Sequence, residues 1–135
     1  RNVLRLPDGA ALEIFNGRDG TWRARCQWVG KRDAALVPAE IIQPQQSLPD
    51  VWLVASPLRQ NRLDWMVEKA TELGVSRLVP VLLKHSSVRQ IKPDRLRQIA
   101  IEAAEQCASN AVPEIAELAD LPALLASWPV ERTLL

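Results

Sequence analysis

With 135 residues, the chain has the length of one domain, or of a small module joined to part of a larger one. Its residues are 47% hydrophobic and 24% charged, which is ordinary for a globular protein and excludes a disordered or fibrous chain. The net charge of +1 is too small to predict a nucleic-acid partner by itself.

Neither a membrane span nor a metal site is predicted. No apolar run approaches the roughly 20 residues that cross a bilayer, and Arg1 does not open a signal peptide, so we expect a cytoplasmic protein. Cys26 and Cys107 form no CxxC pair and have no histidine nearby, which argues against zinc. We expect both to be small buried hydrophobic residues.

Residues 1–46 have the two-residue period of β-strands. Leu12 and Ile14 alternate with polar neighbours, and a turn at residues 16–20 leads to a strand with one apolar face. That face comprises Trp22, Ala24, Cys26 and Trp28. A third run, residues 34–42, is interrupted by Pro38, as in an edge strand or a bulge. We predict a small antiparallel β-module, either a barrel or a strongly curved sheet.

Strands alternate with helices after a polar, proline-bearing linker at residues 43–49. We predict strands at 51–55 and 77–83, a helix at 61–73, a helix from Pro93 to Cys107, a short helix at 121–126 and a strand beginning near Thr133. Asn61 is the expected N-cap of the first helix, and Gly74 is placed to end it. The domain at residues 47–135 is therefore α/β, with its ligand site expected at the carboxyl ends of the strands.

Each long helix has one apolar stripe. The expected buried residues are Leu63, Met66, Val67, Ala70 and Leu73 on the first helix, and Leu96, Ile99, Ala100, Ala103 and Cys107 on the second. Arg95, Gln98, Glu102, Glu105 and Ser109 form the polar face of the second helix.

Candidate chemistry is sparse. His85 is the only histidine and follows the second strand of the α/β domain, but no nearby residue marks a triad. Glu102 and Glu105 could share acid–base work, although such a pair is usually a solvated helix face. The loop at residues 85–92 is polar and basic, and its Arg89 and Lys92 could bind phosphate. The charge asymmetry is mild: residues 1–46 carry seven Lys and Arg against five Asp and Glu, a net +2, and the remainder carries −1.

Four short motifs recur in order along the chain. They are residues 63–75 (LDWMVEKATELGV), Val79-Pro80, residues 99–106 (IAIEAAEQ) and Val112-Pro113. This combination resembles the ribosomal RNA small subunit methyltransferase E family of the SPOUT superfamily. Residues 1–6 and 15–20 resemble the family's PUA-like β-barrel, an RNA-binding module.

The resemblance implies a homodimeric enzyme that transfers a methyl group from S-adenosylmethionine to N3 of a uridine in 16S ribosomal RNA. In this family the cofactor lies in a carboxy-terminal trefoil knot with a Gly-Pro-Glu-Gly-Gly type motif, which is absent from residues 1–135. We therefore expect the cofactor pocket and most of the dimer interface beyond Leu135. The family also tends to have arginine where this chain has His85 and Ser109.

The residues expected to contact RNA are basic side chains of the β-module and of the strand ends. They are Arg1, Arg5, Arg23, Arg25, Arg62, His85, Arg89 and Lys92. Lys69, Glu72, Glu105 and Gln106 match the family motifs, but helix packing explains them equally well, and no catalytic base is assigned. Two alternatives stay open: a non-catalytic RNA-binding protein with a degenerate SPOUT domain, and a SPOUT methyltransferase of different RNA specificity.

Overall fold

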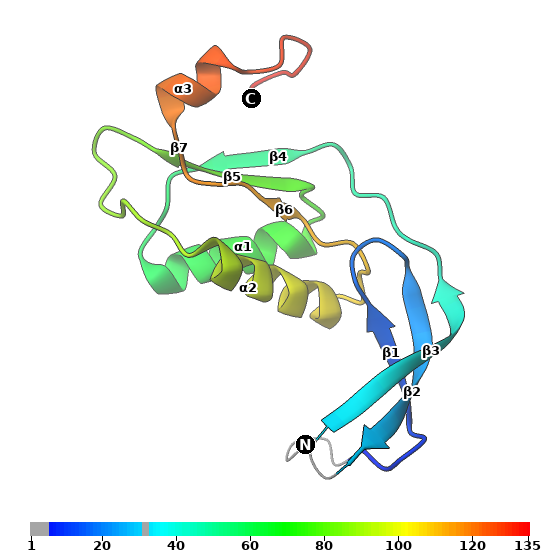
Figure 1. Ribbon diagram of the computed structural model, residues 1–135. Helices are drawn as coiled ribbons and strands as arrows, with labels where there is room; N and C mark the ends of the chain where they lie inside the picture. The colour runs from blue at the N-terminus through cyan, green and yellow to red at the C-terminus, as the bar shows by residue number, and fades with distance from the viewer. Residues whose placement is uncertain (1–5, 31–32) are drawn as a thin grey trace. The chain divides into compact units, whose positions relative to one another are not determined.

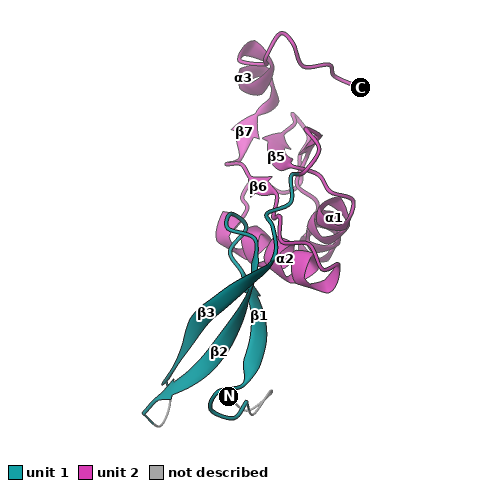
Figure 2. Cartoon of the chain, turned by 90° about the vertical axis from the view of Figure 1, so that its right-hand side faces the viewer, with its two compact units in different colours: residues 1–47 teal, residues 48–135 magenta. Residues whose placement is uncertain are grey.

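The chain divides into two units, each with its own sheet. The computed structural model describes residues 6–30 and 33–135, and contacts separate Arg1–Ser47 from Leu48–Leu135 (Figure 2). The first unit is all-β, and the second is α/β (Figure 1). The mixed α/β class expected from the sequence is confirmed.

Unit 1 is an antiparallel sheet with the order β1-β2-β3. Its strands are β1 (Ala11–Phe15), β2 (Thr21–Val29) and β3 (Asp33–Gln43). Ala24 and Cys26 are buried on one face of β2, as the alternation predicts. In the described part of this unit β1 and β3 each pair only with β2, so closure into a barrel stays a prediction.

The turn and the bulge of unit 1 have clear local causes. Asn16 Oδ1 accepts hydrogen bonds from the backbone N–H groups of Arg18 and Asp19, which closes the turn between β1 and β2. On the other side of β2, Arg23 lies opposite Glu40 and Ala24 opposite Pro38, so residue 39 is extra. Of the two expectations for Pro38, an edge strand or a bulge, the bulge is confirmed, and among the described residues β3 is also an edge strand.

Unit 2 has a parallel sheet with β5 at its centre. The strands are β4 (Trp52–Ala55), β5 (Arg77–Leu82), β6 (Glu114–Ile115) and β7 (Ala119–Asp120), and the helices are α1 (Gln60–Glu72), α2 (Pro93–Gln106) and α3 (Leu121–Ala126). β6 pairs with the start of β5 and β7 with its end. Pro80 lies between the two paired stretches of β5. Because proline has no N–H to donate, the neighbouring strand is interrupted there and forms two separate strands, β6 and β7.

Helices α1 and α2 lie side by side and pack against the sheet from one face (Figure 1). The shared core comprises Leu63, Val67, Ala70, Leu78, Leu96, Ala100 and Ile115, all less than a tenth exposed. Two of the predicted buried residues are wrong. Leu73 is 83% exposed and Cys107 is also exposed, because each is the C-cap of its helix and lies beyond the packed turns.

The predicted start of one helix and one predicted strand are also wrong, and two short strands were missed. Helix α1 begins one residue earlier than expected, with Arg59 as its N-cap and Asn61 inside the first turn. The Arg59 carbonyl already accepts hydrogen bonds from the Arg62 and Leu63 N–H groups, so the chain is helical before Asn61 could cap it. No strand forms at residues 133–135, and β6 and β7 were missed because two residues show no period.

Both long helices end in a Schellman motif. After α1, the Val75 N–H donates to the Ala70 carbonyl and the Gly74 N–H to the Thr71 carbonyl. Gly74 has a φ of 80°, the left-handed conformation that this motif requires. After α2, the same left-handed position is occupied by Ala108, with a φ of 55°. An alanine pays a steric penalty there that a glycine does not.

These two positions predict opposite effects on stability. Gly74→Ala should lower the free energy of unfolding by about 1 kcal/mol, while Ala108→Gly should raise it by up to about 1 kcal/mol. A Cβ at Gly74 would meet Pro49 no closer than 3.8 Å, so backbone strain rather than a clash is tested. Urea denaturation of the protein and both variants measures the difference, and shifts of the same sign would contradict the assignment.

A cluster around Trp52 attaches residues 128–132 to the start of β4. The Arg132 guanidinium lies 3.9 Å from the Trp52 ring centroid and donates to both Asp50 carboxylate oxygens at 2.6 Å. Trp128 packs edge-on against Trp52, with ring centroids 5.7 Å apart. Its Nε1 donates to the Arg132 carbonyl. Arg77 also lies over the Trp52 ring, at 4.5 Å.

Removing the Arg132 charge should free this segment without unfolding the core. A cation–π contact and a charge-assisted hydrogen bond are lost in Arg132→Gln, so we expect endoproteinase Glu-C to cleave after Glu131 several times faster. Arg97→Gln is the control because it removes an ion pair elsewhere on the surface. Equal cleavage rates in the two variants would show that Arg132 does not hold the segment.

Candidate functional site

The loops that follow β4 and β5 emerge at the same edge of the sheet because these strands are parallel. The Ser56 and Ser86 hydroxyl oxygens are 2.8 Å apart, which joins the two loops. Ser86 Oγ also accepts a hydrogen bond from the Leu83 N–H at 2.8 Å. The basic loop after β5 is thereby fixed beside the start of α1.

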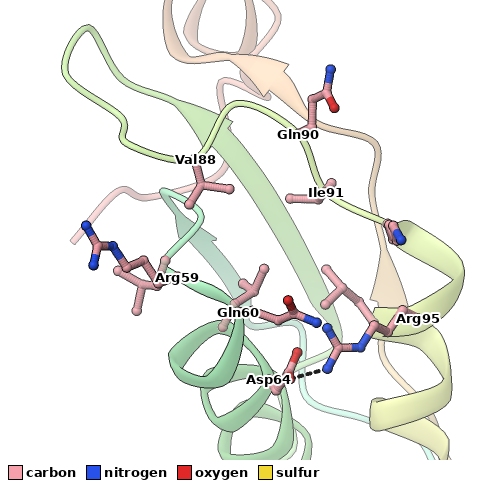
Figure 3. A pocket seen from close by; sticks show the side chains of 11 residues that line it. Arg59, Gln60, Asp64, Val88, Gln90, Ile91 and Arg95 are labelled. Atoms are coloured by element: carbon pink, nitrogen blue, oxygen red, sulfur yellow. Dashed lines mark hydrogen bonds and ion pairs between the residues drawn. The ribbon is translucent and has the colours of Figure 1, made fainter.

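A pocket of about 370 Å³ lies where α1 and α2 begin (Figure 3). Its charged lining is Arg59 and Asp64 from the start of α1, with Lys92 and Arg95 from the start of α2. The apolar lining comprises Leu58, Leu63, Val88, Ile91 and Leu96. Figure 3 shows Arg59 and Arg95 at opposite sides of the pocket, with Gln60 projecting between them toward Asp64.

The electrostatics of the pocket favour an anion. Arg95 donates to Asp64 Oδ2, which fixes the guanidinium while leaving most of its donors unused. Arg59 and Lys92 add two cations, so the lining carries three positive charges against one carboxylate. Neither α1 nor α2 has a side-chain N-cap hydrogen bond, and the N–H groups of Gln60 and Asn61 in α1 and of Asp94 in α2 have no partner within the helix. The positive ends of two helix dipoles therefore add to the side-chain charge.

Asp64 has one unusual feature. Its Oδ1 atom is buried and has no hydrogen-bond partner in the described structure. A buried acceptor without a donor costs free energy, so the ion pair with Arg95 must offset this cost at Asp64. The ion pair with Arg95 links the first turn of α1 to the first turn of α2.

Of the predicted RNA-contacting residues in unit 2, only Lys92 lines the pocket. Arg62, His85 and Arg89 are exposed and lie outside its lining. Arg59 and Arg95 were not among the predicted contacts. From the sequence, Arg95 was placed on the polar face of α2. Its position in the first turn of a helix that begins at Pro93, directly after a basic loop, could have indicated that it lies at the site.

The residues that match the family motifs lie at the far end of each helix from the pocket. Lys69 and Glu72 are in the last turn of α1, and Glu105 and Gln106 are in the last turn of α2. At 1.5 Å per residue, the nine residues from Leu96 to Glu105 separate the last pair from the pocket by about 14 Å. The structure does not bring these residues to the pocket.

Lys69 is a helix-surface charge. Hydrogen bonds to the Glu68 carboxylate, and then to the Glu72 carboxylate, raise the pKa of Lys69 above its ordinary value. The ammonium is therefore fully protonated at neutral pH and cannot accept a proton. This agrees with the assignment of no catalytic base among these residues.

Unit 1 presents two of the predicted RNA-contacting arginines on the exposed face of β2. Arg23 lies between Glu13 and Glu40 in the sheet register and forms an ion pair with Glu40. Arg25 lies between Ala11 and Val37, so its cross-strand neighbours do not offset its charge. Arg1 and Arg5 lie outside the described residues.

Ser109, one of the two positions where the family tends to have arginine, has a local structural role. Its hydroxyl donates to the Ala111 carbonyl and accepts from the Ala111 N–H, both at 3.1 Å. His85, the other position, is exposed. No cluster of three or more potential metal ligands occurs among the described residues. No helix in residues 6–30 or 33–135 is long and apolar enough to cross a membrane.

Comparison with known proteins gives a consistent result. The family model for an RNA methyltransferase domain matches residues 44–135. Ribosomal RNA small subunit methyltransferase E from Bacillus subtilis is 32% identical over 133 residues, covering 92% of this chain and 51% of that protein. The Rickettsia conorii protein of the same name is 29% identical over 106 residues, covering 78% of this chain and 43% of that protein.

A solved structure shows the same fold. It is a ribosomal RNA small subunit methyltransferase E from Neisseria gonorrhoeae bound to S-adenosyl methionine, 28% identical, with a TM-score of 0.78. The match covers 96% of this chain and 56% of that one. The chain thus spans about half the length of the relatives it matches. Since the family model covers more than half of its residues, the chain belongs to the ribosomal RNA small subunit methyltransferase E family of RNA methyltransferases.

Proposed function

We propose that the complete protein transfers a methyl group from S-adenosylmethionine to N3 of a uridine in 16S ribosomal RNA. The observation that carries this proposal is the family match over residues 44–135. The likeness to a relative bound to S-adenosyl methionine supports the choice of cofactor. The cationic pocket at the strand ends supports a polyanionic substrate.

The reaction sets requirements that the described residues meet only in part. Uracil N3–H is a weak acid, so the enzyme must help to remove its proton and must hold N3 in line with the methyl group. Asp64 is the one carboxylate in the pocket lining, and Arg95 holds one of its oxygens while the other is buried. We therefore assign no catalytic base within the pocket.

The pocket also does not fit the cofactor. S-adenosylmethionine carries a positive sulfonium, and three cations against one carboxylate would disfavour it there. We assign this pocket to RNA and derive no step of methyl transfer through it.

The remaining parts of the proposal rest on the family resemblance. Unit 1 would belong to a PUA-like barrel that contacts RNA, and unit 2 to a SPOUT domain that forms a homodimer in the cytoplasm. The sheet of unit 1 has an exposed arginine on β2, which is compatible with an RNA-contacting surface.

Two measurements on the protein from its complete reading frame test the function. Isothermal titration should show S-adenosylmethionine binding, and mapping of 16S ribosomal RNA should show one methylated uridine that disappears when the gene is deleted. RNA binding without cofactor binding would favour a non-catalytic RNA-binding protein. Cofactor binding with an unchanged 16S pattern would favour another RNA substrate.

Arg23 and Arg25 provide a matched pair for the role of unit 1. Arg25→Gln should weaken RNA binding more than Arg23→Gln, because glutamates already offset the Arg23 charge. Both side chains project from the same face of β2, so the comparison keeps the site constant. Fluorescence anisotropy with labelled 16S RNA fragments measures the affinities. Equal losses, or a larger loss for Arg23, would count against RNA contact by this face.

A further inference from the structure

We propose that the pocket between the starts of α1 and α2 receives one unpaired nucleotide of the substrate RNA and holds the strand in register. One phosphate would lie against Lys92 and Arg95 at the start of α2, a neighbouring phosphate of the strand against Arg59 on the opposite side, and the base against the apolar wall. This inference rests on the proposed function, and it adds a binding site and the form of RNA that the site accepts.

Size and composition support a nucleotide. A volume of about 370 Å³ falls at the lower end of small-ligand pockets, which is too small for a duplex. Val88 and Ile91 project into the pocket beside Gln60 in Figure 3, and they provide apolar contact for a flat base. A small inorganic anion such as phosphate would make no use of this apolar wall, whereas a nucleotide base would.

Charge and geometry place the phosphate at the helix starts. The N–H groups of Gln60 and Asn61, which open α1, have no partner within the helix and directly follow Arg59. Arg95 is 40% exposed while paired with Asp64, so its guanidinium is oriented and still has free donors. An oriented arginine loses less entropy on binding a phosphate than a free one does.

An unpaired strand fits better than a helix of RNA. Proteins read single-stranded RNA by placing splayed bases against side chains, whereas duplex RNA is bound by its outer shape. A concave pocket with a closed apolar wall can contact a splayed base, and it cannot contact one that is stacked in a duplex.

Charge-neutralising variants test the phosphate contact. Lys92→Gln and Arg59→Gln in the complete protein should each weaken binding of a fluorescein-labelled octauridylate about tenfold. Each should also make the salt dependence shallower by about 0.7 in log–log slope, as expected for one lost phosphate contact on a single strand. Lys92→Arg should retain the affinity, because it keeps the charge.

Matched controls come from the same segments. Lys84→Gln alters a lysine of the same loop, and Arg97→Gln alters an arginine two residues after Arg95 that is also paired with an aspartate. Neither residue lines the pocket, so both variants should bind octauridylate as the unaltered protein does. Losses equal to those of Lys92→Gln would show that only overall charge matters and would overturn the proposal.

A steric variant tests whether the nucleotide enters the pocket. Val88→Trp fills the space without changing charge and should weaken octauridylate binding at least fivefold, whereas Val88→Ala, which only trims the apolar wall, should weaken it by less than half that factor. Unchanged affinity in Val88→Trp would overturn occupancy of the pocket, even if the charge variants bind weakly. A duplex of the same length should bind less tightly than octauridylate, and equal binding would contradict selection of unpaired RNA.

Cofactor titration separates this inference from the proposed function. S-adenosylmethionine affinity should be the same in all of these variants, because the pocket is not assigned to the cofactor. If the unaltered protein methylates RNA and the pocket variants bind octauridylate normally, the pocket proposal fails and the function stands. If the protein binds no cofactor but the pocket variants lose octauridylate affinity, the function fails and the pocket stands.

Discussion

The parallel pairing of β4 and β5 is the constraint on which the rest of unit 2 depends. Each strand is followed by a helix, so parallel strands place the starts of α1 and α2 at one edge of the sheet. Small buried residues, Ala70 on α1 and Ala100 on α2, allow the helices to pack closely in the shared core. The convergence of two positive helix ends, and hence the pocket, follows from this arrangement.

Such convergence has an electrostatic cost, since like charges in one pocket repel each other. Asp64 lowers that cost by pairing with Arg95 across the two helices. The pairing with Arg95 offsets the cost of leaving Asp64 Oδ1 buried without a donor, because the carboxylate keeps the Arg95 guanidinium in place. The pocket is therefore a preorganised cationic site for an anion.

The sequence predicted most of the fold because long elements have strong periods and clear ends. Pro93 starts α2 and Gly74 follows α1, as their backbone preferences require. The two-residue strands β6 and β7 were missed, since pairing with β5 rather than local sequence defines them. The prediction that Leu73 and Cys107 are buried was wrong because the apolar stripe of a helix does not show at which turn its packing against the sheet stops.

The candidate site was harder to predict than the fold. Lys92 was found because it belongs to a visibly basic loop, whereas Arg59 and Arg95 look like ordinary surface charges until the two helix starts are brought together. The motif residues that identify the family, such as Lys69 and Glu105, lie at the other end of the helices. Leu63 and Asp64, by contrast, belong to the motif at residues 63–75 and line the pocket, so the family motif and the proposed RNA pocket overlap at the start of α1.

The break in the strand beside β5 has a dynamic consequence. β6 is paired only with Arg77 and Leu78, and β7 only with Val81 and Leu82, with Pro80 between them. Two short ladders open more easily than one continuous ladder of the same total length, because each closes with few hydrogen bonds. We therefore expect the amide hydrogens of β7 and α3 to exchange with solvent faster than those of β4 and the helix pair.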